Sequence, residues 1–297
     1  MTTELQNKIA KNNELIEKEL EKYFKNTGND DLDRILEAER YSVLGGGKRI
    51  RPFIVNEMCR MLGGDLSQSL PYACAIERRH VYSLIHDDLP CMDDDDTRRG
   101  RPSSHKEFGY ATALLAGDAL LTKAFGVAAG NTAVSAEINV EAIKVLSRTA
   151  GDLGMIGGQV MDLAGETREL ELEEILMLHS MKTGALMMCA ALLGCLAAGY
   201  TPDSEEAKRA SLFARKIGMA FQVIDDMLDE VGEEDELGKN IHSDAEHNKS
   251  TFMTYYDCEG AKKYAEELTA EAISEISVFE GSETLTDLAA YLLDRTY

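Results

Sequence analysis

The stretch Tyr82–Arg101 reads YSLIHDDLPCMDDDDTRRGR, with six aspartates between Asp87 and Asp96 and two adjacent arginines after Thr97. So much negative charge in a short run costs free energy unless cations neutralise it. Mg²⁺ prefers carboxylate oxygens and accepts phosphate oxygens of a partner in the same coordination shell. Arg98 and Arg99 carry planar guanidinium groups that match phosphate geometry. The stretch therefore predicts a diphosphate site that works through metal, although a solvated acidic loop is the ordinary interpretation of such a run.

A second acidic motif lies far downstream, where residues 221–229 read FQVIDDMLD. Asp225 and Asp229 are four residues apart, so they share one face of a helix. The neighbouring residues are apolar, which predicts a buried helix, and buried carboxylates without partners are costly. Aspartates on a solvated helix face would explain this motif alone. The two motifs together predict Mg²⁺ ions held between facing helices by Asp87, Asp88, Asp93, Asp225, Asp226 and Asp229.

The composition favours helix, because Ala, Leu, Glu, Lys and Met are plentiful and there are only five prolines. Apolar periodicity and Gly or Pro breaks predict helices near residues 5–25, 32–42, 52–62, 70–89, 109–131, 136–152, 155–164, 171–199, 203–231, 259–279 and 284–295. Pro90 should end the fourth of these at Leu89, so that Asp93 returns to the site through a loop. No alternating strand pattern, repeat or linker is visible. We therefore expect one all-α domain over residues 1–297.

The overall charge and the cysteines limit the possible partners. A net charge of −22 argues against binding to nucleic acid or to an anionic membrane. The six cysteines show neither C-x-x-C nor zinc spacing, which is typical of reduced thiols in a cytosolic protein. The N-terminus has no apolar signal region, and the most apolar stretch, Ala185–Ala198, is shorter than the about 18 residues of a membrane span. We expect a cytoplasmic protein without a membrane span.

A glycine-rich basic segment, GGGKRIRP at residues 45–52, could bind a second diphosphate without metal. It is not a P-loop, because Ser42 stands at the first glycine position and Arg49 stands where Ser or Thr is required. A basic turn that caps a helix is the alternative. An EF-hand is excluded as an explanation of the first acidic motif, because a loop registered on Gly100 would place Arg99 at a ligand position and end on Lys106.

Several polar residues interrupt apolar helices. His80 lies seven residues before Asp87 on the same helix stripe, where either a phosphate contact or a structural role is open. Lys182 sits in a hydrophobic helix and needs an anion there. Gln222 lies one turn before Asp226. Two further lysines, Lys239 and Lys249, follow the second acidic helix in a polar loop.

In this order, GGKRIRP, SLIHDDLPCMD, RRGRP, AGDALL, KTG, FQxxDDxxD and LGK resemble the motifs of the trans-isoprenyl diphosphate synthases, closely the bacterial farnesyl and geranylgeranyl diphosphate synthases. The resemblance covers essentially the whole chain. It implies a type I isoprenoid synthase helical bundle with a deep central cavity, usually assembled as a homodimer. It also implies three Mg²⁺ ions, with Mn²⁺ as a possible substitute.

Roles for individual residues follow from the same resemblance. The six aspartates would hold the metal. The allylic diphosphate would also contact Arg98, Lys182, Gln222, Lys239 and Lys249. Isopentenyl diphosphate would bind Gly47, Lys48, Arg51, His80 and Arg99. The catalytic residues would be Lys182, Thr183 and Gln222, of which Thr183 and Gln222 can face an allylic carbocation without trapping it.

The expected reaction condenses isopentenyl diphosphate with dimethylallyl or geranyl diphosphate to (2E,6E)-farnesyl diphosphate. In the family, an aromatic residue at the position of Tyr82, together with a two-residue insertion in the first acidic motif, goes with this product. Tyr82, Ser83 and Arg79 are therefore expected to set chain length. Arg78 and Arg79 depart from the apolar residues usual there, and should either reach the dimer interface or surface or form an unusual pocket floor. The alternatives are a geranylgeranyl or geranyl diphosphate synthase, a terpene cyclase and a non-catalytic regulatory subunit.

Overall fold

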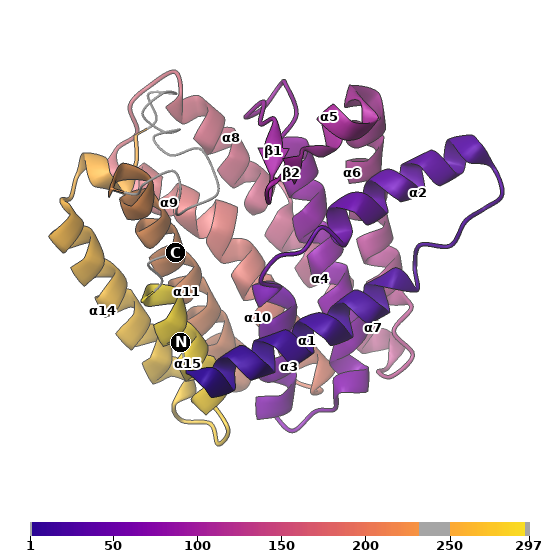
Figure 1. Cartoon of the computed structure of the whole chain (residues 1–297). Helices are drawn as coiled ribbons and strands as arrows, with labels where there is room; N and C mark the ends of the chain where they lie inside the picture. The colour runs from indigo at the N-terminus through magenta and orange to yellow at the C-terminus, as the bar shows by residue number, and fades with distance from the viewer. Residues whose placement is uncertain (1, 232–249, 295–297) are drawn as a thin grey trace.

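Helix α4 (Leu66–Asp87) runs through the middle of the bundle and carries the first acidic motif at its C-terminal end (Figure 1). It packs against α3 (Ile50–Met61), α6 (Tyr110–Ala129) and α10 (Ala185–Ala197). The Asp65 carboxylate accepts a hydrogen bond from a backbone N–H of the first turn, which caps the helix start. The site therefore rests on a helix that is covered on several sides.

The computed structural model describes residues 2–231 and 250–294. Helices dominate these ranges, as predicted, and their ends lie within a few residues of the expected ones. The others are α1 (Thr3–Glu21), α2 (Asp30–Val43), α5 (Ser104–Phe108), α7 (Ala136–Ala150), α8 (Met155–Gly165), α9 (Leu172–His179), α11 (Glu205–Val231), α14 (Cys258–Ile276), α15 (Glu283–Leu293), the π-helical turn η1 (Ser180–Gly184) and the 3₁₀ turn η2 (Phe252–Thr254).

The single helix predicted over residues 171–199 is instead α9, the turn η1 and α10 in succession. Helix α8 approaches this turn closely: a Cβ atom added to Gly158 would lie 2.4 Å from the backbone nitrogen of Lys182. A hydrophobic pattern indicates a helix but does not distinguish a π turn from an α turn. The prediction was therefore right about helix and wrong about its continuity.

A short antiparallel hairpin follows the first acidic motif, whereas no strand was predicted. Its strands, β1 (Thr97–Arg98) and β2 (Arg101–Pro102), are joined by Arg99 and Gly100, both of which have positive φ. Two left-handed residues in a row are the signature of the tight hairpin turn that suits strand twist. Strands of two residues are too short to show an alternating pattern.

Two segments are long and apolar enough to cross a membrane by length and composition, which corrects the expectation that none is: α6 and Leu172–Ala197. Most of the apolar window within Leu172–Ala197 is buried, as is typical of a core helix, and nearly every residue of α10 is enclosed. Only a third of the α6 window is buried, and Leu114 and Leu115 are exposed. Helix α6 therefore presents an apolar face at the surface of this chain.

Candidate active site

The loop after α4 returns Asp93 to the end of the helix, as predicted. The backbone N–H of Asp93 donates to the backbone oxygen of Asp87 at 2.9 Å, and that of Asp94 donates to the oxygen of Leu89 at 3.2 Å. Asp94 takes up a positive φ of 51°, which reverses the chain direction. The loop thus brings the two ends of the first acidic motif together.

The carboxylate of Asp87 accepts a hydrogen bond, but its surroundings disfavour its ionised form. Gln159, on α8, donates its side-chain N–H to Asp87. Burial raises the pKa of Asp87 to about 7; Lys182 opposes this rise, and Asp93 adds to it. A carboxylate whose ionised form is this unfavourable is a good ligand for a divalent cation.

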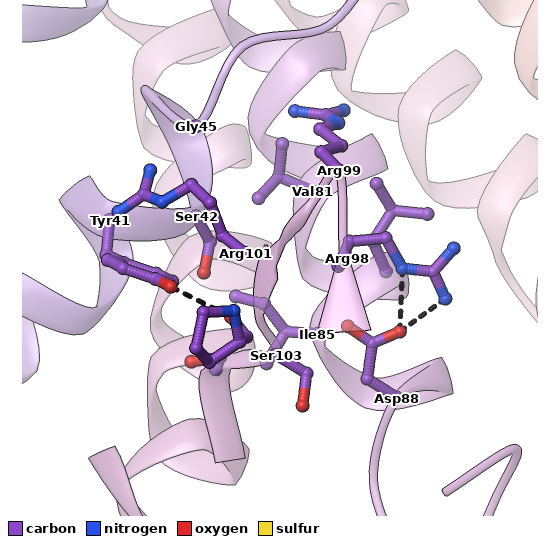
Figure 2. Close-up of a pocket in the computed structure, with 13 residues that line it drawn as sticks. Tyr41, Ser42, Gly45, Val81, Ile85, Asp88, Arg98, Arg99, Arg101 and Ser103 are labelled. Atoms are coloured by element: carbon purple, nitrogen blue, oxygen red, sulfur yellow. Dashed lines mark hydrogen bonds and ion pairs between the residues drawn. The ribbon is translucent and has the colours of Figure 1, made fainter. Parts of the chain in front are cut away.

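Arg98 and Arg99 point in different directions from the hairpin (Figure 2). The Nε atom of Arg98 donates to buried Asp88 at 2.8 Å, and Arg98 also lies 3.1 Å from Asp95. Arg99 extends away from Asp88 and donates to the backbone oxygen of Gly46. The two adjacent arginines therefore lie in different surroundings: Arg98 is beside the first acidic motif, and Arg99 is beside the glycine-rich segment.

A basic cluster forms where Arg99 meets the glycine-rich segment. A Cβ atom on Gly47 would lie 2.8 Å from the guanidinium carbon of Arg99, so a side chain at this position would displace that guanidinium. Burial lowers the pKa of His80 well below its usual range, and Arg51 and Arg99 lower it further. Burial also lowers the pKa of Arg51 to about 10. Four of the five residues expected to bind isopentenyl diphosphate thus lie together.

Two other cations of this segment lie elsewhere. Arg49 is buried and pairs with Glu77, and its guanidinium also donates to the backbone oxygen of Val43 at 2.6 Å. Arg49 therefore stabilises the fold and is not available to a ligand. Lys48, predicted to bind isopentenyl diphosphate, is exposed, with its Nζ atom 5.6 Å from the centre of the Tyr291 ring. Its role stays a prediction.

Lys182 projects from the π-helical turn and finds the anion that the sequence required. Its Nζ atom lies 2.7 Å from the Asp162 carboxylate of α8. Burial by itself would lower the pKa of Lys182, but Asp162, Asp87 and Asp93 together raise it. Lys182 is therefore a charged group next to the first acidic motif. Asp162 was not predicted from the sequence, although Lys182 itself indicated that some carboxylate should be near.

A hydrogen-bonded chain links the turn to the second acidic motif. Thr183 donates through Oγ1 to Oε1 of Gln222 at 2.9 Å, and Nε2 of Gln222 donates to Oδ1 of Asp226 at 3.2 Å. The other oxygen of Asp226, Oδ2, lies 3.2 Å from Nε2 of His179 and accepts from the backbone N–H of Phe252 at 2.9 Å. His179 was not predicted to belong to the site, although it lies close to Lys182 in the chain.

No group of three or more His, Cys, Asp or Glu side chains in residues 2–231 and 250–294 is arranged to hold a metal ion by itself. Mg²⁺ often binds through one or two carboxylates together with water and substrate phosphates, so the paired carboxylates fit an ion that arrives with a diphosphate. The two lysines predicted to close over the phosphates, Lys239 and Lys249, lie outside the described residues.

The residues expected to set chain length are enclosed. Tyr82 is buried, and its hydroxyl has no hydrogen-bond partner in the described part of the chain. The guanidinium of Arg79 lies 5.6 Å from the Tyr82 ring centre and 5.7 Å from that of Phe125. Arg78 lies over the ring of Tyr23 instead, at 4.6 Å. Both arginines are at most 2% exposed, so the idea that they reach the surface of this chain is wrong.

Ser83, the third residue expected to set chain length, donates through Oγ to the backbone oxygen of His80 at 2.8 Å within α4.

Comparison with known proteins agrees with this geometry. The family described as polyprenyl synthetase matches residues 33–289. The chain belongs to the polyprenyl synthetase family. It is 42% identical to farnesyl diphosphate synthase of Haemophilus influenzae over 262 residues, which cover 88% of each chain. It is also 42% identical to chloroplastic geranylgeranyl pyrophosphate synthase 7 of Arabidopsis thaliana over 267 residues, 88% of this chain and 76% of that one.

Solved structures of polyprenyl synthetases share the fold. An FPP/GFPP synthase from Zymomonas mobilis superposes with a TM-score of 0.89 at 35% identity and covers 98% of this chain and 100% of its own. A geranyltransferase from Helicobacter pylori, complexed with magnesium and isoprenyl diphosphate, has a TM-score of 0.84 at 33% identity and covers 99% and 98%. The family resemblance and the helical bundle are thereby confirmed, whereas the depth of a central cavity and a single domain over residues 1–297 stay predictions.

Proposed function

We propose that this polyprenyl synthetase is a Mg²⁺-dependent trans-prenyltransferase. It condenses isopentenyl diphosphate with dimethylallyl or geranyl diphosphate to (2E,6E)-farnesyl diphosphate and releases diphosphate. The observation that carries the proposal is that two distinct candidate sites for diphosphate, the first acidic motif and the basic cluster, are neighbours. Lys182 joins the first acidic motif on one side, and Arg99, Gly47, Arg51 and His80 form the basic cluster on the other.

The acidic side takes the allylic substrate. When bound, Mg²⁺ neutralises charge on the leaving diphosphate; we propose three ions, replaceable by Mn²⁺, on Asp87, Asp88, Asp93, Asp225 and Asp229. Lys182 and Arg98 would orient the diphosphate by charge-assisted hydrogen bonds, together with Lys239 and Lys249. Gln159 fixes the direction of the Asp87 carboxylate. This arrangement stabilises negative charge where it develops as the carbon–oxygen bond breaks.

The basic cluster takes isopentenyl diphosphate. Arg51 and Arg99 supply permanent positive charge, and His80 is neutral in the free protein because burial lowers its pKa. A neutral imidazole can still donate one N–H to a phosphate oxygen. Lys48 is proposed to join when the diphosphate arrives. The double bond of this substrate then attacks the allylic cation that Thr183 and Gln222 face, and the departing diphosphate takes the proton.

Farnesyl diphosphate is favoured as the product because Tyr82 and Arg79 together enclose the helix face below Asp87. A bulky ring and a buried guanidinium would both resist a longer hydrocarbon chain. Geranylgeranyl diphosphate synthase is the second candidate, since relatives with that name are as similar to this chain as those named farnesyl diphosphate synthase. Ser83 is proposed to line the same region.

A homodimer is proposed to cover the apolar face of α6. Tyr110, Leu114 and Leu115 are 48%, 39% and 50% exposed on this helix, whose apolar window is only a third buried. Burial against a second copy would remove this surface from water, in keeping with the proposed cytoplasmic location without a membrane span. Light scattering after gel filtration should give twice the chain mass for the natural protein and the single-chain mass for Leu115→Asp.

The decisive experiment supplies purified protein with Mg²⁺, isopentenyl diphosphate and dimethylallyl diphosphate and identifies the alcohols after hydrolysis. Farnesol supports the proposal, and geranylgeraniol supports the second candidate. Hydrocarbon formed from farnesyl diphosphate without consumption of isopentenyl diphosphate would indicate a terpene cyclase. No consumption with any allylic primer would overturn the prenyltransferase proposal and indicate a regulatory subunit.

A further inference from the structure

We propose that Asp226 is a positioning residue that fixes the amide of Gln222, in place of the metal role expected from its motif; the inference rests on the proposed function. The Asp226 side chain is 5% exposed, and that of His179 is 4% exposed. Both carboxylate oxygens of Asp226 already have partners. Oδ1 accepts from Gln222, and Oδ2 accepts from Phe252 N–H and lies within hydrogen-bond distance of His179.

Helix geometry separates the Asp226 side chain from that of Asp225. Successive residues of an α-helix point about 100° apart, whereas residues four apart share a face. Asp225 therefore points about 100° away from Asp226, Asp229 lies between the two directions, and Asp226 is turned toward His179 of α9 and Phe252. The second acidic motif therefore faces two different parts of the structure. The proposed metal role stays with Asp225 and Asp229.

The chemical consequence falls on Gln222. An ionised carboxylate only accepts hydrogen bonds, so Asp226 requires the NH₂ end of the Gln222 amide to face it. The amide oxygen of Gln222 must then point to Thr183, whose hydroxyl donates to it at 2.9 Å. The hydroxyl proton of Thr183 is thereby committed to this hydrogen bond. The lone pairs of its oxygen can then face an electron-poor carbon of the substrate. Asp226 thus sets the polarity of the two side chains proposed to face the carbocation.

His179 and Phe252 hold this carboxylate in place from the opposite side. Phe252 is fully buried and stacks on Tyr256 with ring centres 4.5 Å apart, and it lies 5.0 Å from Tyr264 of α14. Its backbone N–H therefore has a fixed direction. Loss of any one of these partners would leave the other buried polar groups unsatisfied.

The test compares Asp226→Asn with its matched neighbour Asp225→Asn. The amide that the first substitution introduces can both donate and accept, so it no longer dictates the direction of Gln222. Asp226→Asn should lower the Tm by about 4 °C or more and lower kcat by at least about tenfold. It should bind as many Mn²⁺ ions as the natural protein in the presence of inorganic diphosphate, counted by electron paramagnetic resonance. Asp225→Asn should lose an ion.

A loss of Mn²⁺ in Asp226→Asn with an unchanged Tm would overturn the inference. If Asp226→Asn does not fold, His179→Leu and His179→Gln take its place. Leucine should lower both Tm and kcat, whereas glutamine, which can place an N–H near the Nε2 position, should restore them; equal behaviour of the two would overturn the inference. If the natural protein neither binds Mn²⁺ with diphosphate nor consumes isopentenyl diphosphate, the proposed function fails. The Tm comparison still tests whether Asp226 holds Gln222 and His179 in place.

Discussion

The Lys182 ammonium lies 2.7 Å from the Asp162 carboxylate, so α8 holds the cation of the π-helical turn beside the first acidic motif. Asp162→Asn removes the counter-charge that orients Lys182. We expect a decrease in kcat/KM for the allylic substrate of about tenfold or more, because charged hydrogen bonds contribute about 1.5–3 kcal/mol. Steady-state kinetics would measure it. Glu141→Gln, which breaks the exposed Lys144–Glu141 pair, should leave the rate unchanged. Equal rates in both variants would contradict the role of Asp162.

Gly117 makes room for His86. A Cβ atom at this position would lie 2.1 Å from Nε2 of His86, whose ring also contacts the Leu114 backbone oxygen at 3.0 Å. We expect Gly117→Ala to lower the Tm by several degrees, as measured by calorimetry. Gly126→Ala is the matched control on the same helix, since nothing lies within 4 Å of its added Cβ. It should raise the free energy of unfolding by about 0.5–1 kcal/mol through helix propensity. A stable Gly117→Ala would show that His86 moves freely.

The raised pKa of Asp87 makes stability depend on pH. Between its ordinary value of 3.8 and its folded value of about 7, the folded protein holds a proton that the unfolded chain has released. The metal-free protein should therefore lose stability as pH rises through this window. Asp87→Asn removes the effect, so its Tm relative to the natural protein should increase by about 2–4 °C between pH 5 and 8. Thermal melts in chelator would measure this, and a Tm difference independent of pH would refute the assignment.

Arg79 and Arg78 form a matched pair for product length. Arg79 lies against Tyr82, whereas Arg78 lies against Tyr23. We expect Arg79→Leu, alone or with Tyr82→Ala, to extend part of the product beyond farnesyl diphosphate, because an apolar side chain replaces a buried charge. Arg78→Leu should keep the product of the natural protein. Chromatography of the hydrolysed alcohols decides, and a longer product from Arg78→Leu alone would contradict this placement.

Substitutions of Gly46 and Gly47 distinguish the effect of backbone strain from the effect of a steric contact with Arg99. Both have positive φ, 85° and 119°, but only Gly47 has Arg99 within reach of an added Cβ. Gly47→Ala should raise KM for isopentenyl diphosphate about tenfold beyond any effect of Gly46→Ala, because it displaces a guanidinium that binds diphosphate. KM for the allylic substrate should change far less. Equal effects of the two substitutions would indicate strain alone.

Residues adjacent in sequence were the most predictable part of the site. The Asp87–Asp93 loop and the Asp225–Asp229 spacing follow from local geometry, because Pro90 ends one helix and a four-residue spacing defines one face of the other. The hydrogen bond from the Asp93 backbone to Asp87 confirms the return of the loop. Arg49 was less predictable: its backbone has a positive φ of 47°, and its side chain turns to Glu77 although it sits among cations that were expected to face a ligand.

Partners brought by tertiary packing could not be predicted. Gln159, Asp162 and His179 lie on α8 and α9, and nothing in their local sequence states which helix they face. Lys182 required an anion but did not name it. Likewise, the buried positions of Arg78 and Arg79 depend on aromatic rings from α6 and from the residues that follow α1. Such contacts depend on how whole helices are placed, which a single sequence pattern does not determine.

The π-helical turn Ser180–Gly184 also constrains how many residues the chain can have between α9 and α10. A π turn contains one residue more than an α turn of the same hydrogen-bonding ladder, so its insertion shifts all later side chains around the helix axis by about 100°. Deleting a single residue here would restore a regular helix, yet it would turn either Lys182 from α8 or Thr183 from α11. The number of residues between His179 and Ala185 is therefore as important for the site as the residue types are. A sequence alignment that closes a gap in this segment would equate side chains that face different helices.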